Sequence, residues 1–143
     1  MQFDTNNRIV KLCAEGMDLE GEGRNGEALL LFQQAWEEAA TDFERFVSAH
    51  YVARHQESVA DKLKWDETAL QSALRINDVT VEGAFPSLYL NIGKCYEDLQ
   101  DFHKARLNYS LGLSYADSLL DDGYGNMIRG GIMNGLERVG DPH

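Results

Sequence analysis

Apolar residues recur along the chain at the three- and four-residue spacing of amphipathic helices. The first such stretch carries Ile9, Leu12 and Cys13, with residues 4–6 as candidates for its cap. It ends where three glycines fall within residues 21–26, and helix interiors rarely contain glycine at that density. A second apolar stretch follows the glycines. The pattern therefore predicts a helical hairpin at about residues 6–40.

Capping signals predict where the next helices begin. Thr41 and Glu44 form the Thr-x-x-Glu pattern of a capping box, so a third helix should start there. Asp61 is the expected cap of a fourth helix, which completes a second hairpin at about residues 42–76. Residues 77–85 are predicted to be a connector that contains a further helical turn.

The remaining residues predict a third hairpin and one more helix. Pro86 suits the first turn of a fifth helix, because the backbone N–H that proline lacks would have no partner within the helix there. Asp101 should cap a sixth helix that continues to Leu119, which places the hairpin at about residues 86–120. A final helix is expected at about residues 126–139. No segment shows the alternating pattern of a strand, so the fold class is predicted to be all-α.

Six positions of the first hairpin have counterparts 77 positions later in the third hairpin. Leu12, Gly16, Leu19, Ala28, Phe32 and Ala35 correspond to Tyr89, Gly93, Tyr96, Ala105, Tyr109 and Gly112. Internal repetition of a helical hairpin is the sequence signature of a stacked repeat architecture. In both copies the spacing from glycine to alanine is 12 residues, since 28 − 16 and 105 − 93 are equal.

This arrangement of glycine, turn, alanine and aromatic residue resembles the tetratricopeptide repeat. The resemblance implies a single domain, residues 1–143, in which about three hairpins form a right-handed α–α superhelix and the final helix covers the last hairpin. The middle hairpin diverges, because Arg54 or His55 stands where the family has glycine. Gly130, Gly131 and Gly135 weaken the final helix, and either close packing against the third hairpin or mobility of this helix would account for them.

Composition narrows the function classes. The net charge of −11 disfavours nucleic acid and anionic membrane surfaces as partners. The N-terminal residues show no apolar run of signal-peptide length, so a cytoplasmic protein is expected. His50 and His55 are five residues apart, about 140° around a helix, and do not form a chelating pair. We expect no metal, no cofactor and no catalytic residue.

The resemblance also implies a function, because in this family the first helices of successive hairpins line a groove that binds peptides or protein segments. His50, Arg54 and Glu57 are expected to share one face of the third helix. The candidate partner-binding residues are His50, Arg54, Asn91, Lys94 and Arg129, with Tyr124 at the rim. Such a cluster suits an acidic peptide, a terminal carboxylate or a small anion. The alternative is that these charges are solvated and paired with neighbouring acidic residues.

Some relatives clamp the terminal carboxylate of chaperone tails with a lysine and an asparagine, but Cys13 and Met17 occupy those positions here. A protein-interaction module is therefore predicted without that clamp. The alternatives are a self-associating subunit and an enzyme such as an RNA methyltransferase. The residues do not support the enzyme, which needs a sheet and a glycine-rich loop after a strand.

Overall fold

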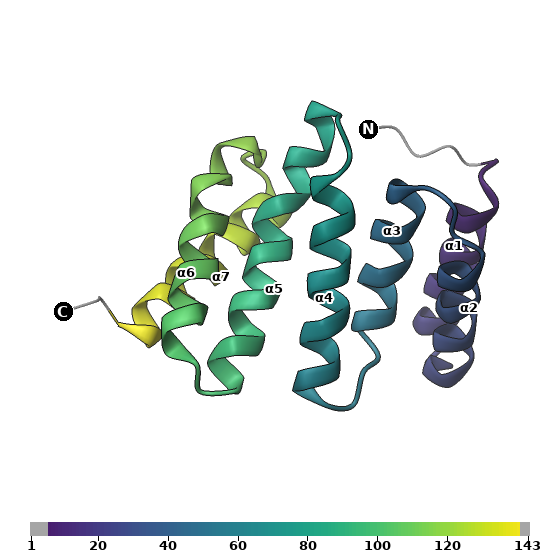
Figure 1. Ribbon diagram of the computed structural model, residues 1–143, viewed down its shortest axis with the longest axis horizontal. Coiled ribbons are helices and arrows are strands. Elements are labelled where there is room, and N and C mark those ends of the chain that lie inside the picture. Colours follow the sequence, from purple (N-terminus) through teal and green to yellow (C-terminus); the bar gives the residue numbers. More distant parts are fainter. Residues whose placement is uncertain (1–5, 141–143) are drawn as a thin grey trace. The chain divides into compact units, whose positions relative to one another are not determined.

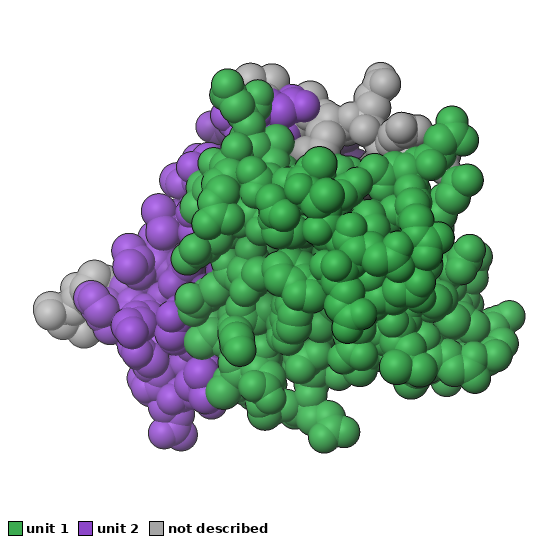
Figure 2. Space-filling model, turned by 45° about the vertical axis from the view of Figure 1, so that its right-hand side comes forward, with its two compact units in different colours: residues 1–77 green, residues 78–143 purple. Residues whose placement is uncertain are grey.

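The computed structural model describes residues 6–140, and no strand is found among them. The all-α prediction is confirmed. Contacts between backbone positions divide the chain into two compact units, residues 1–77 and residues 78–143 (Figure 2). Each unit is described by itself.

Unit 1 contains four helices that form two hairpins (Figure 1). They are α1 (Arg8–Gly21), α2 (Asn25–Glu38), α3 (Asp42–Ala53) and α4 (Val59–Leu74). α1 packs against α2, and α3 packs against α4. α3 also contacts both helices of the first hairpin, so three helices meet around one core.

The caps of unit 1 agree with the sequence at one helix and differ at two. The Thr41–Glu44 capping box is present at the start of α3. Of the expected caps of α1, Asp4 and Thr5 lie outside the described residues, and the cap is Asn7, whose Oδ1 accepts from the Ile9 amide at 2.8 Å. The cap of α4 is Ser58 rather than Asp61. Asp61 lies in the first turn, where its own amide donates to the Ser58 hydroxyl.

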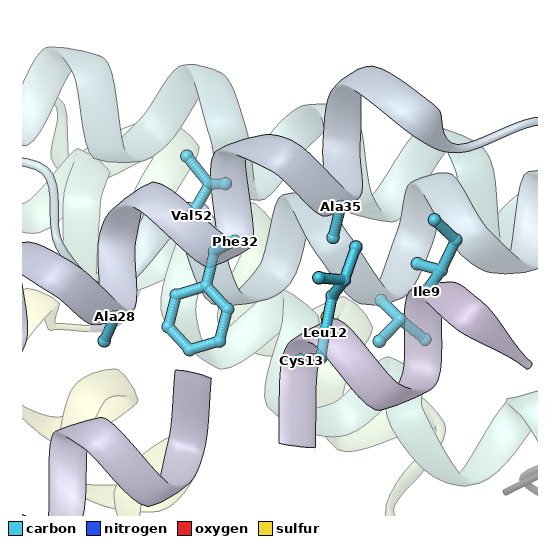
Figure 3. Packing of buried hydrophobic residues seen from close by; sticks show 8 residues of the cluster. Ile9, Leu12, Cys13, Ala28, Phe32, Ala35 and Val52 are labelled. Atoms are coloured by element: carbon cyan, nitrogen blue, oxygen red, sulfur yellow. The ribbon is translucent and has the colours of Figure 1, made fainter. Parts of the chain in front are cut away.

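Phe32 forms the centre of the unit 1 core, and its side chain has no solvent exposure. It projects from α2 among residues of α1 and Val52 of α3 (Figure 3). A Cβ atom added to Gly16 would overlap the Phe32 ring, so only glycine lets α1 approach this closely. The ring of Tyr51 stacks on Phe32 with 5.0 Å between centroids. The aromatic side chain of α2 is thus packed between a glycine of α1 and a ring of α3.

Unit 2 contains a hairpin and a further helix. Its elements are η1 (Val79–Ala84), α5 (Phe85–Asp98), α6 (Phe102–Ser114), η2 (Ala116–Ser118) and α7 (Gly123–Val139). α5 packs against α6, and α7 packs against both. The first-turn position of Pro86 and the Asp101 cap are confirmed, and η1 is the helical turn expected in the connector.

The segment that joins α6 to α7 differs from the prediction. α6 ends at Ser114, before the predicted Leu119, and η2 follows it. The guanidinium of Arg129 donates to the carbonyl oxygens of Leu119 and Leu120, which lie between η2 and α7. α7 begins at Gly123 rather than near residue 126, because the Asp122 side chain accepts from the Gly125 amide and caps it there.

Tyr109 has the same place in unit 2 that Phe32 has in unit 1. A Cβ added to Gly93 of α5 would lie 2.7 Å from the Tyr109 ring, and one added to Gly135 of α7 would lie 2.6 Å from it. Gly131 is also close to a neighbour, Leu90 of α5. Close packing therefore accounts for Gly131 and Gly135. Gly130 has no neighbouring atom within 4 Å of a Cβ position, and nothing in the structure explains it.

Replacing two glycines of α7 by alanine should change the free energy of unfolding in opposite directions. Gly130→Ala adds a methyl group in open space and removes a poor helix former, so the free energy of unfolding should rise by about 0.5–1 kcal/mol. Gly135→Ala drives the same methyl group into Tyr109 and should lower that free energy by about 1–3 kcal/mol. Urea unfolding of both variants checks this pair. Equal effects of the two substitutions would contradict the packing described.

Candidate functional site

The six predicted binding residues fall in both units. His50 and Arg54 belong to unit 1, whereas Asn91, Lys94, Tyr124 and Arg129 belong to unit 2. Their surroundings differ widely, from a buried ring to an exposed side chain.

Arg54 is tied to the first hairpin. Its guanidinium lies 3.3 Å from Oε1 of Glu20 and 5.2 Å from the centre of the Tyr51 ring. The predicted face of His50, Arg54 and Glu57 on one helix is wrong, because α3 ends at Ala53. Arg54 is the C-cap residue, and Glu57 lies beyond the helix.

His50 is mostly buried, and its Nδ1 has no hydrogen-bond partner. Burial lowers the pKa of the imidazole, and the positive charge of Arg54 lowers it further. The ring meets Tyr51 edge to face, with 5.3 Å between centroids. A neutral imidazole in this position is a packing residue of α3 and carries no charge toward a partner.

The unit 2 residues have separate roles. Lys94 pairs with Asp98 one turn further along α5, with 2.8 Å between Nζ and Oδ1, and both side chains are about half exposed. Arg129 donates to the backbone carbonyls of Leu119 and Leu120, in the segment that precedes α7, so its role is structural. Asn91 is half-buried on α5, and Tyr124 is exposed. Lys94 and Arg54 are thus paired with acidic side chains, as the alternative interpretation of these charges predicted.

A pocket lies between α1 and α3, the first helices of the two hairpins of unit 1. Its volume is about 270 Å³, and we name it the α1–α3 pocket. It is lined by Val10, Cys13, Ala14, Met17, Val47 and Tyr51. The walls are apolar except for the Tyr51 hydroxyl. Because the Arg54 guanidinium lies over the Tyr51 ring, a positive charge stands beside one wall.

The repeat explains why unit 1 has space at this place. The residue 77 positions after Cys13 is Leu90, whose side chain reaches Gly131 of α7. Cys13 is shorter than leucine and leaves room between its helix and α3. Burial raises the pKa of the Cys13 thiol to about 12, so the sulfur is a neutral, apolar wall.

In each unit, one glutamate links the first helix to the third helix or to the residues that follow it. The sequence pattern did not predict these contacts. Glu20 binds Arg54, and its other oxygen lies 2.6 Å from Nε2 of His55. Glu97 accepts from the Tyr109 hydroxyl at 2.7 Å and pairs with Arg138 at 2.8 Å. Hydrogen bonds from Arg138 lower the pKa of Glu97. These glutamates also differ by 77 positions, which is the signal that could have found them.

Comparison with known proteins adds no relative. No family model, curated protein or solved structure matches the chain. Within residues 6–140, no helix is long and apolar enough to cross a membrane. The same residues contain no group of three histidine, cysteine or acidic side chains that could hold a metal ion.

The mostly buried His50 should make the free energy of unfolding depend on pH. Its pKa is lowered in the folded state, so the unfolded chain takes up the proton at a higher pH. The contribution of the neutral His50 ring to the free energy of unfolding is complete above the ordinary pKa near 6.5. It is lost as pH falls through that value toward the lowered pKa.

Between about pH 7.5 and about pH 5.5, the free energy of unfolding should therefore fall further in wild type than in His50→Gln. Denaturant titrations at several pH values measure this difference. His103→Gln replaces an exposed histidine and serves as the matched control. Parallel pH curves for wild type and His50→Gln would show that the buried ring is not the cause.

Proposed function

We propose that this protein is a tetratricopeptide-like, non-catalytic module that binds a peptide or protein segment through the α1–α3 pocket. The observation that carries the proposal is the position of this pocket. α1 and α3 are the first helices of two successive hairpins, and first helices form the binding surface in the family that the sequence resembles. The repeated glycine–aromatic contact of Gly16 and Phe32 with Gly93 and Tyr109 supports the relationship.

The dimensions of the pocket suit one anchoring side chain. At about 270 Å³ it is smaller than the pockets of roughly 300–1,000 Å³ that hold drug-sized molecules. Burial of a leucine, methionine or phenylalanine side chain from a partner would contribute about 1.5–3 kcal/mol. The pocket therefore supplies affinity by apolar contact.

Arg54 gives the bound segment a direction. Its side chain is 45% exposed, so guanidinium N–H groups remain available although Glu20 takes one of them. A carboxylate of the partner that lies next to the anchoring residue would pair with this group. We therefore favour a partner segment that combines an apolar anchor with an adjacent acidic or terminal carboxylate group.

Filling the pocket should abolish this binding. Ala14 is exposed and lines the pocket, so Ala14→Phe would place a ring in the space without disturbing the buried core. A random peptide library selected on wild type should yield sequences with an apolar residue beside a carboxylate. Their affinity for Ala14→Phe should be at least about tenfold lower.

Ala40→Phe is the matched control, since it adds the same ring at an exposed position outside the pocket. Selected peptides should bind this variant as they bind wild type. Selection of no peptide, or equal binding to Ala14→Phe, would contradict the proposed function.

A further inference from the structure

A second and larger hollow lies on a different side of unit 1, between α2, the start of α3 and α4. Its volume is about 500 Å³, and it shares no residue with the α1–α3 pocket. We name it the α2–α4 groove. Trp36 of α2 and Leu63 of α4 form apolar walls, and most of the remaining lining comes from one face of α4.

The groove concentrates positive charge in an acidic protein. Arg45, Lys64 and Arg75 line it, and Glu67 is the only acidic side chain among its lining residues. The chain as a whole carries a net charge of −11. Together with Asp42, whose carboxylate contacts both arginines, the count is three cations to two carboxylates, so the local charge is positive whereas that of the whole chain is negative. A partner that enters here must therefore offer negative charge.

The two arginines converge at one end of the groove. Nη2 of Arg45 lies 3.3 Å from Oδ1 of Asp42, and Nη1 of Arg75 lies 4.0 Å from the same oxygen. Asp42 therefore holds both guanidinium groups near one point. A guanidinium has five N–H donors, and the Arg75 side chain is 61% exposed. Donors remain for an incoming carboxylate.

Lys64 lies toward the other end. It precedes Arg75 by 11 residues, which corresponds to about 16 Å along a helix axis. The polar side chains of Thr68 and Gln71 line the groove between them. One small anion does not reach both positions. An extended peptide advances about 3.3 Å per residue, so carboxylates about five residues apart would reach both.

We propose that the α2–α4 groove binds an acidic peptide segment in extended conformation. One carboxylate pairs with Arg45 and Arg75, a second pairs with Lys64, and an apolar residue between them contacts Trp36 and Leu63. This site is independent of the α1–α3 pocket, so one unit would hold two different partner segments.

The test uses a defined probe. It is an acetylated and amidated hexapeptide with glutamate at positions 1 and 6, and its four inner positions contain one leucine, with serine or glycine at the other three. The same peptide with glutamine in place of glutamate is the uncharged comparison. The protein contains two tryptophans, so the indole N–H region of a nitrogen–proton NMR spectrum shows few signals. The Trp36 signal should shift on titration with the glutamate peptide and stay in place with the glutamine peptide.

Arg45→Gln/Arg75→Gln should weaken this binding by about tenfold or more, since charge-assisted pairs to a carboxylate are among the strong hydrogen bonds. Arg8→Gln/Arg24→Gln removes the same charge from exposed positions of unit 1 outside the groove and should leave the affinity unchanged. Lys64→Gln changes an exposed residue and tests the second contact even if the double variant folds poorly.

Four results would overturn the proposal. They are equal binding of the glutamine peptide, equal weakening by the two double variants, saturable binding of inorganic phosphate as tight as that of the glutamate peptide, and loss of peptide binding in Ala14→Phe. The last result would place the probe in the α1–α3 pocket. If Ala14→Phe binds the glutamate peptide normally, failure of the first proposal does not affect the second.

Discussion

The contact between a glycine of one helix and an aromatic ring of the next is the constraint on which each unit depends. In unit 1 the ring is Phe32 and the glycine is Gly16, and in unit 2 they are Tyr109 and Gly93. A larger residue at either glycine would push the two helices apart. An aromatic ring has two faces, and the face that does not meet the glycine must also be covered. A third helix covers it in both units, with Tyr51 in one and Gly135 in the other.

The third helix of each unit is further positioned by a glutamate. Glu20 reaches across to the end of α3, and Glu97 reaches Arg138 of α7. An exposed ion pair contributes little to stability, but here the glutamates are largely shielded from solvent and bind two partners each. The Glu20 contacts join α1 to the residues that directly follow α3. The α1–α3 pocket lies between these two helices, where Cys13 is a shorter side chain than its repeat partner Leu90.

The parts of the fold that depend on local chemistry were predictable from the sequence. Thr41 with Glu44, Pro86 and Asp101 mark helix starts through interactions within one turn, and each was assigned correctly. The 77-residue spacing identified the glycine and aromatic positions because close packing restricts the residue types allowed there. The end of α3 at Ala53 was missed, since Arg54 and His55 carry no stop signal and depend on Glu20, 34 and 35 residues earlier.

The candidate site was less predictable than the fold. The sequence pointed to charged residues, yet Arg129 binds backbone carbonyls and His50 is a mostly buried, neutral ring. Both outcomes depend on tertiary neighbours that helical spacing does not reveal. The α1–α3 pocket was not predicted either, because a hollow is defined by what a small residue such as Cys13 leaves empty. The clue was the difference between Cys13 and its repeat partner Leu90.

Amide hydrogen exchange of Phe32→Leu tests most directly whether the aromatic ring positions the third helix. Leucine keeps an apolar side chain on α2 but removes the flat surface that Tyr51 stacks on. If the ring positions α3, amide protection in residues 42–53 should fall together with that in α1 and α2. Wild-type protection throughout α3, with loss confined to α1 and α2, would contradict this account.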